Sequence, residues 1–129
     1  LVITGTREWA DYAVQAEITP HLAQACGIAA RVQGLRRYYA LLLAPNGQLR
    51  LIKVLHTEQV LAETDFAWEL EQTYPLKLEV EANRLRAFVA EQLVFDVVDA
   101  DAPLLSGGIA LVVEDGRCGT HAVQVAPLA

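Results

Sequence analysis

Hydrophobic and polar residues alternate in short runs along the whole chain, and turn residues separate the runs. Between Asp11 and Thr19, for example, every second residue is apolar. A period of two is typical of a β-strand with one buried face and one solvated face. The clearest runs span residues 11–19, 26–33, 38–44, 48–55, 76–81, 84–89, 107–114 and 121–126. The pattern predicts about ten short strands and excludes parallel α/β folds, which need helices between strands.

The runs 38–44 and 48–55 flank Asn46-Gly47, the residue pair that best tolerates the two positive φ angles of a type I′ turn. We therefore expect a hairpin with a two-residue loop. Its register would pair Leu43 with Arg50, Leu41 with Ile52, Tyr39 with Val54, and Ala40 with Lys53.

A second hairpin is predicted across Ala82-Asn83, between residues 76–81 and 84–89. Leu76, Leu78 and Val80 would face Val89, Ala87 and Leu85, with Glu79 opposite Arg86 and Glu81 opposite Arg84. A further turn is expected at Asp115-Gly116. Phe66, Trp68 and Leu70 alternate with more polar residues and are interpreted as a strand. Strands without helices predict one antiparallel two-sheet β-sandwich, of the jelly-roll kind, over residues 1–129.

The composition narrows the function classes. With 53% hydrophobic residues in 129, the chain can bury one core. Its net charge of −6 disfavours nucleic-acid binding, which needs a basic surface. No apolar stretch approaches the roughly 20 residues that span a bilayer, and the start lacks a signal peptide's charged region. These features predict no membrane partner and a cytoplasmic location, with secretion left open because the parent N-terminus is missing.

Two residue types bear on the chain's context. Methionine is absent, so we expect a piece of a longer protein with a neighbouring domain. The two cysteines, Cys26 and Cys118, lie far apart in sequence. Such sparse cysteine favours two free thiols in a reducing compartment over a disulfide.

Seven short motifs occur in an order that resembles the concanavalin A-like domains, in particular fructan-binding modules and keto-disaccharide hydrolase-like accessory domains. They are Gly5-x3-Trp9-x-Asp11-Tyr12, Gly27-Ile28-x2-Arg31-x-Gln33, Tyr38-Tyr39-x-Leu41, Leu51-x-Lys53, Leu78-x-Val80-Glu81-x-Asn83, Phe95-Asp96 and Gly107-x-Ile109. The resemblance covers nearly the whole chain and implies a concanavalin A-like sandwich.

The C-terminal part, Leu111 to Pro127, is similar to domains appended to bacterial ADP-ribosylglycohydrolase-like enzymes. Ala82 and Ala90-Glu91 depart from the family, which tends to have Gly or Asp-Gly at these turns. Because alanine at positive φ costs about 1 kcal/mol, longer turns or turns of another type are expected there.

Strand register suggests the candidate site. If residues 34–37 close a four-residue loop, Gln33 pairs with Tyr38 and Arg31 with Ala40, which also neighbours Lys53. Arg31, Gln33, Tyr38 and Lys53 would then share one sheet face, and placing residues 11–19 alongside would add Gln15 and Glu17. Polar groups beside an aromatic ring suit a sugar, although a solvated or domain-packing face has the same pattern.

Other chemistry is weakly indicated. Glu63-x-Asp65-x3-Glu69 is similar to an acidic glucanase motif, but in a strand Glu63 and Glu69 would be about 20 Å apart, too far for a catalytic pair. The histidines show no metal-ligand spacing, and no cofactor is implied. The leading hypothesis is a non-catalytic accessory module that binds a carbohydrate or an ADP-ribose-like ligand beside a glycohydrolase domain. The alternatives are a packing module without a ligand and a stand-alone glycosidase.

Overall fold

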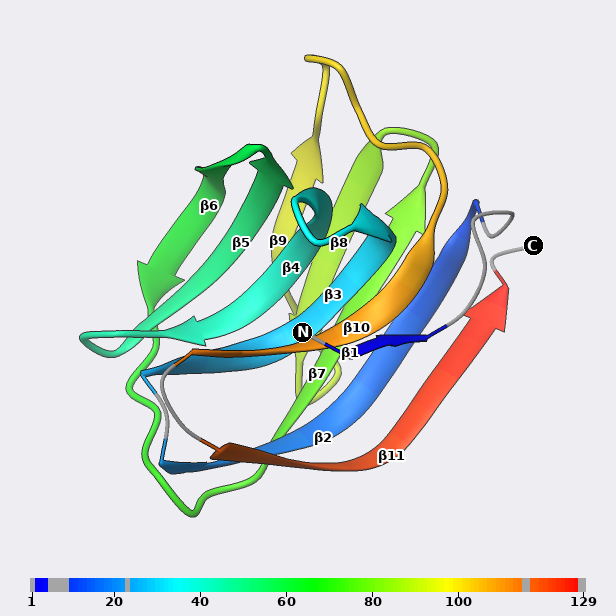
Figure 1. Cartoon of the computed structure of the whole chain (residues 1–129). Coiled ribbons are helices and arrows are strands. Elements are labelled where there is room, and N and C mark those ends of the chain that lie inside the picture. The colour runs from blue at the N-terminus through cyan, green and yellow to red at the C-terminus, as the bar shows by residue number, and fades with distance from the viewer. Residues whose placement is uncertain (1, 5–9, 23, 115–116, 128–129) are drawn as a thin grey trace.

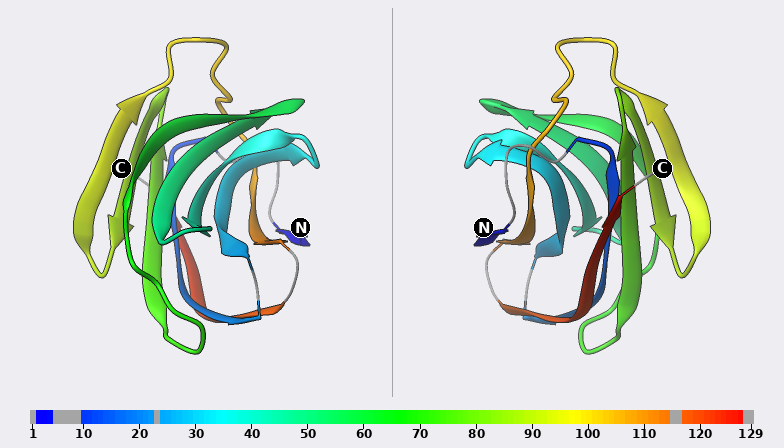
Figure 2. Two further views of the ribbon diagram at one scale, coloured as in Figure 1. Left: turned by 90° about the vertical axis from the view of Figure 1, so that its left-hand side faces the viewer. Right: turned by 90° about the vertical axis from the view of Figure 1, so that its right-hand side faces the viewer.

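The computed structural model describes residues 2–4, 10–22, 24–114 and 117–127. These residues form eleven strands in two antiparallel sheets that pack face to face (Figures 1 and 2). Sheet A has the order β1 (Val2–Thr4), β10 (Gly108–Glu114), β3 (Ala25–Gly34), β4 (Arg37–Ala44), β5 (Gln48–Leu55), β6 (Thr57–Asp65). Sheet B has the order β11 (Arg117–Pro127), β2 (Tyr12–Leu22), β7 (Tyr74–Glu81), β8 (Arg84–Val89), β9 (Gln92–Val98). The predicted sandwich is confirmed.

The core lies between the sheets and follows the predicted alternation. Tyr12, Val14, Ala16 and Ile18 of β2 point inward, as do the alternate residues of β7 and β8. The described residues contain no helix that is long and apolar enough to cross a membrane. Gly5, Trp9, Asp115 and Gly116, on which some expectations rested, lie outside the described residues.

The β7–β8 hairpin has the predicted register, with Glu79 opposite Arg86 and Glu81 opposite Arg84. The expectation of longer turns is wrong for Ala82 and Ala90-Glu91. Glu81 pairs with Arg84 and Val89 with Gln92, so both loops have two residues. Ala82, Ala90 and Glu91 adopt φ angles of 49°, 50° and 67°. These turns keep their tight geometry at the expense of local backbone strain.

The β4–β5 hairpin is present, but its predicted register is wrong by one residue. Ala44 pairs with Gln48, so the loop contains Pro45 as well as Asn46-Gly47. Tyr39 consequently pairs with Lys53, and Ala40 with Ile52. A shift of one residue reverses the facing of a whole strand. Lys53 therefore points into the sandwich, and Ile52 and Val54 point out of it.

Two further expectations are wrong. Residues 66–70 form no strand, because β6 ends at Asp65; Trp68 instead packs on the core and donates from Nε1 to the carbonyl oxygen of Ala44 at 2.6 Å. Residues 11–19 do not lie beside β3. They belong to sheet B, where β2 pairs with β7 and β11.

Close approach of β3 and β4 depends on Gly27. A Cβ atom at Gly27 would lie 1.9 Å from the carbonyl oxygen of Leu41, whereas one at Gly34 would meet nothing within 4 Å. We expect Gly27→Ala to lower the free energy of unfolding by about 3 kcal/mol, because the strands must separate. Gly34→Ala, the control, should change it by less than about 0.5 kcal/mol. Chemical denaturation measures both, and equal effects would contradict the close packing of these strands.

Candidate functional site

The predicted polar face does not exist as one surface. Arg31 is fully buried and Lys53 is 2% exposed, whereas Gln33 and Tyr38 are half-buried at the β3–β4 end. Gln33 donates to the carbonyl oxygen of Ser106 at 2.8 Å, and Tyr38 packs on an apolar cluster on the outer face of sheet A. Gln15 and Glu17 are exposed on sheet B, on the opposite side of the sandwich. The structure thus divides the six predicted residues among three places.

A β-bulge explains the position of Arg31. Ala30 pairs with Tyr39 but Gly34 pairs with Arg37, so residues 31–33 lie opposite Tyr38 alone. The predicted four-residue loop is therefore wrong, and Arg31 adopts a φ of 51°. This bulge turns the side chain of Arg31 into the interior.

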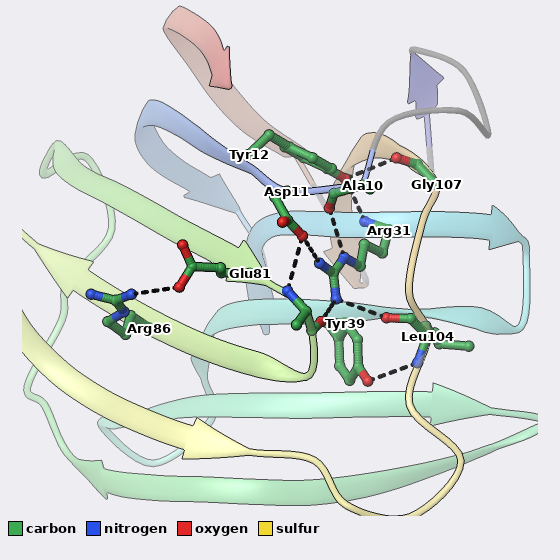
Figure 3. Close-up of polar contacts among 10 residues, drawn as sticks. Ala10, Asp11, Tyr12, Arg31, Tyr39, Glu81, Arg86, Leu104 and Gly107 are labelled. Carbon is green, nitrogen blue, oxygen red and sulfur yellow. Dashed lines mark hydrogen bonds and ion pairs between the residues drawn. The ribbon is translucent and has the colours of Figure 1, made fainter. Parts of the chain in front are cut away.

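The guanidinium of Arg31 connects β3 to three other segments (Figure 3). Nε donates to the carbonyl oxygen of Ala10 at 3.0 Å, and Nη1 to the carbonyl oxygens of Leu104, also at 3.0 Å, and Ala82. Nη2 lies 3.1 Å from the carboxylate of Asp11. Burial lowers the pKa of Arg31, and the nearby Asp11 carboxylate opposes that shift. Because these acceptors occupy the donors of its guanidinium, Arg31 holds the chain together and is closed to a ligand.

Lys53 has an equivalent role. Its ammonium lies 2.8 Å from the carboxylate of Asp99 and donates to the backbone oxygens of Asp101 and Ala102. The hydroxyl of Tyr39 donates to the same carboxylate at 2.6 Å and accepts from the amide of Leu104 at 2.9 Å. We call Arg31, Tyr39, Lys53 and Asp99 the loop anchor, because together they hold the loop of residues 99–107 that leads from sheet B to sheet A.

Burial and hydrogen bonding shift the acidities of the loop anchor. Burial raises the pKa of Tyr39, and its bond to Asp99 adds to that rise. Burial also acts to raise the pKa of Asp99, but hydrogen bonds from Lys53, Tyr39 and the amide of Asp101 outweigh it, so the pKa lies below its ordinary value. Tyr12, beside Arg31, has its pKa raised to about 12, chiefly by burial. The hydroxyl groups of Tyr12 and Tyr39 therefore serve as structural hydrogen-bonding groups.

The outer face of sheet A offers few polar groups at its centre. The buried residues of this cluster are Ala29, Val32, Ala40, Leu42, Ile52, Val54, Ala110 and Val112. On β6, Glu63 forms an ion pair with Arg50, and Asp65 accepts from the amide of Gln48 at 2.6 Å. Glu69 lies beyond the end of β6. The acidic residues of the glucanase-like motif are therefore engaged in surface contacts or lie off the strand.

The outer face of sheet B carries a groove of about 430 Å³. It is lined by Gln15, Ala16, Glu17, Pro75, Leu76, Lys77, Ala90, Glu91 and Gln124. The strand register places Gln124, Gln15, Lys77 and Phe88 in one row across β11, β2, β7 and β8. We call these four residues the cross-strand row.

Contacts within the sheet orient the cross-strand row. The Gln15 amide donates to the Gln124 amide oxygen at 2.6 Å. Lys77 lies 3.1 Å from the Glu79 carboxylate, and its ammonium is 5.0 Å from the centre of the Phe88 ring. Glu79 and Phe88 thus hold the ammonium above the sheet. The row presents two amides and one cation, which can donate to and accept from hydroxyl groups.

Sequence reasoning found Gln15 and Glu17 but missed Lys77, Phe88, Glu91 and Gln124. The alternation of Leu76, Leu78 and Val80 already turns Lys77 outward. What was missing was the neighbour relation of β2, β7 and β11, which depends on strands distant in sequence.

Comparisons with known proteins support the architecture. No family model and no curated protein matches the chain. The carbohydrate binding module CBM66 from Bacillus subtilis superposes with a TM-score of 0.82 at 21% identity, covering 90% of this chain and 74% of that one. Sheep galectin-11 gives 0.70 at 14% identity, covering 97% and 96%. The GH43 protein BlXynB of Bacillus licheniformis gives 0.67 at 10% identity, covering 92% of this chain but 28% of that one.

These similarities show that the chain shares the two-sheet antiparallel β-sandwich fold of CBM66 and galectin-11. The predicted fold is thereby confirmed. The similarity to domains of ADP-ribosylglycohydrolase-like proteins finds no support among the similar structures.

The contacts of Arg31 predict a large effect on stability. Arg31→Met keeps an apolar stem but removes the donor to three carbonyl oxygens and the cation beside the Asp11 carboxylate. We expect the free energy of unfolding to fall by about 4 kcal/mol. Arg36→Met, at an exposed arginine of the same hairpin, should change it by less than about 0.5 kcal/mol. Urea denaturation checks both, and a small effect of Arg31→Met would show that the buried guanidinium is dispensable.

Asp99 predicts an acid-sensitive component of stability. Its pKa is lowered in the folded state, so the unfolded chain takes up the proton first as the pH falls below about 4. The contribution is fully present above that pH and is lost as the pH falls through the folded-state pKa. Asp99→Asn should lower stability by about 3 kcal/mol at pH 7 and flatten the decline between pH 5 and pH 3. Denaturation across this range, with Asp101→Asn as the exposed control, measures it; an unchanged slope would contradict the prediction.

Proposed function

We propose that the chain is a non-catalytic module that binds a carbohydrate in the groove on the outer face of sheet B. The observation that carries this proposal is the cross-strand row of Gln124, Gln15, Lys77 and Phe88. Each side chain comes from a different strand of one rigid sheet, and the strand register fixes their spacing. Binding groups held in this way lose little conformational freedom when a ligand arrives.

The chemistry of the groove suits a ring that carries hydroxyl groups. Gln15 and Gln124 each offer a donor and an acceptor, Lys77 offers donors, and Glu17 offers acceptors. The exposed ring of Pro75 supplies an apolar surface for the C–H groups of a sugar. A few polar groups beside an apolar surface are typical of small-molecule sites.

The charge of the groove favours a neutral glycan over an ADP-ribose-like ligand. The ammonium of Lys77 is already paired with Glu79, and the carboxylates of Glu17 and Glu91 line the same groove. A diphosphate would meet these negative charges there, and like charges repel. We therefore place neutral carbohydrates first and keep ADP-ribose as the ligand to test against them.

We infer in addition that the module serves beside another domain, of which a glycohydrolase is the leading example. The similar part of the GH43 protein BlXynB is 28% of that chain, which supports such an arrangement. CBM66, named as a carbohydrate binding module, and galectin-11 support the ligand class. The stand-alone glycosidase is not proposed, because the glucanase-like motif places its carboxylates in surface contacts or off the strand.

Calorimetric titration against neutral mono- and oligosaccharides and ADP-ribose tests the proposal. We expect one neutral sugar to bind with a Kd in about the millimolar range, because an open groove leaves much of the ligand hydrated. Gln15→Ala and Lys77→Ala should each weaken binding at least about tenfold, the loss of one or two hydrogen bonds. Their melting temperatures should stay close to that of the wild type.

Two control variants distinguish this groove from a binding site on sheet A. Glu58→Ala, at an exposed position of β6 in sheet A, should leave affinity unchanged. If Arg50→Ala on sheet A abolished binding while Gln15→Ala and Lys77→Ala did not, the ligand would bind to sheet A and the groove on sheet B would be excluded. If no sugar bound the wild type, the interpretation as a packing module without a ligand would replace the proposal.

A further inference from the structure

The two cysteines occupy facing positions in opposite sheets. Cys26 is the second residue of β3 in sheet A, and Cys118 is the second residue of β11 in sheet B. Cys26 is fully buried in the core between the sheets, and the half-buried Cys118 packs against the same core. Although 91 residues separate them in sequence, the fold brings them to one place.

The strand connections explain why the sheets approach one another at this point. β2 ends at Leu22 in sheet B and β3 begins at Ala25 in sheet A, while β10 ends at Glu114 in sheet A and β11 begins at Arg117 in sheet B. The four strand ends at which the chain crosses between the sheets lie at the same end of the sandwich (Figure 1). Two residues next to such crossings can come within the short Cα separation that a disulfide requires.

The two thiols are in contact and are chemically unequal. The thiol of Cys26 hydrogen-bonds to the sulfur of Cys118. This bond, together with burial, raises the pKa of Cys26, whereas it lowers the pKa of Cys118 despite partial burial. Cys118 is also the more exposed of the two. Cys118 is therefore the thiol that loses its proton first and the one that a solvent-borne reagent reaches more easily.

We propose that Cys26 and Cys118 form an intramolecular disulfide that links the two sheets when a small-molecule disulfide, such as oxidised glutathione, is the oxidant. The thiolate of Cys118 attacks one sulfur of the oxidant, and a Cys118 mixed disulfide forms as one reduced thiolate leaves. The sulfur of Cys26 then attacks Cys118, releasing the second thiol, and the proton of Cys26 passes to solvent or to the leaving thiolate. Two protein thiols are oxidised and one small-molecule disulfide is reduced to two thiols.

The link would restrain the unfolded chain through a loop of roughly 90 residues, a length for which disulfides stabilise strongly. It would also fasten β11, an edge strand of sheet B, to the central strand β3 of sheet A. This inference is independent of carbohydrate binding, since it needs only the two thiols and the two sheets.

Intact-protein mass spectrometry and thiol titration test the inference on the wild-type chain. After incubation with oxidised glutathione we expect a monomer lighter by two hydrogen atoms, with no titratable thiol in denaturant. The melting temperature should rise by about 10 °C and return to its starting value with a reductant. Cys118→Ser, which keeps the buried Cys26, should show neither change.

Three results would overturn the inference. These are two thiols that remain titratable after oxidation, a stable glutathione adduct on Cys118 that Cys26 does not resolve, and a disulfide between two copies of the chain. The mass measurement on the wild type separates these results even if Cys118→Ser folds poorly.

Discussion

The buried guanidinium of Arg31 is the interaction on which the sandwich most depends. A guanidinium stays charged and carries five donors, so it can be buried only where acceptors surround it. Here those acceptors come from Ala10, Asp11, Ala82 and Leu104, which belong to the approach to β2, the β7–β8 turn and the long loop before β10. One side chain of sheet A thus determines the course of three segments at one end of the sandwich.

Lys53 and Asp99 extend the same principle to the rest of the loop of residues 99–107. A buried ion pair gains little net stability over an apolar pair, because both charges lose their hydration. It does, however, penalise every arrangement in which one charge lacks its partner. Tyr39 and the backbone oxygens of Asp101 and Ala102 satisfy the remaining hydrogen-bonding groups. We therefore attribute to this network the fixed path of the chain from sheet B to sheet A.

The two outer faces differ in chemistry, and this difference locates the proposed binding groove. The outer face of sheet A is apolar at its centre, because the register of β4 and β5 sends Ile52 and Val54 outward and Lys53 inward. The centre of sheet B is apolar only toward the core, and its outer face presents amides and charges. Hydroxyl-rich ligands need such groups, and the proposed sugar contacts are therefore Gln15 and Lys77 instead of the buried Arg31 and Lys53.

The sequence alone determined the sandwich, most strands, the full β7–β8 register and the outward facing of Gln15 and Glu17, because a period of two and turn residues are local properties. It misplaced Arg31 and Lys53, since a bulge at residues 31–33 and one extra loop residue, Pro45, each change which side of a sheet a residue faces. The strand and turn propensities of the residues do not reveal such single-residue shifts. Only tertiary structure supplied the buried acceptors around these cations, the row formed by β11, β2, β7 and β8, and the meeting of Cys26 with Cys118, because all three depend on contacts between residues far apart in the chain.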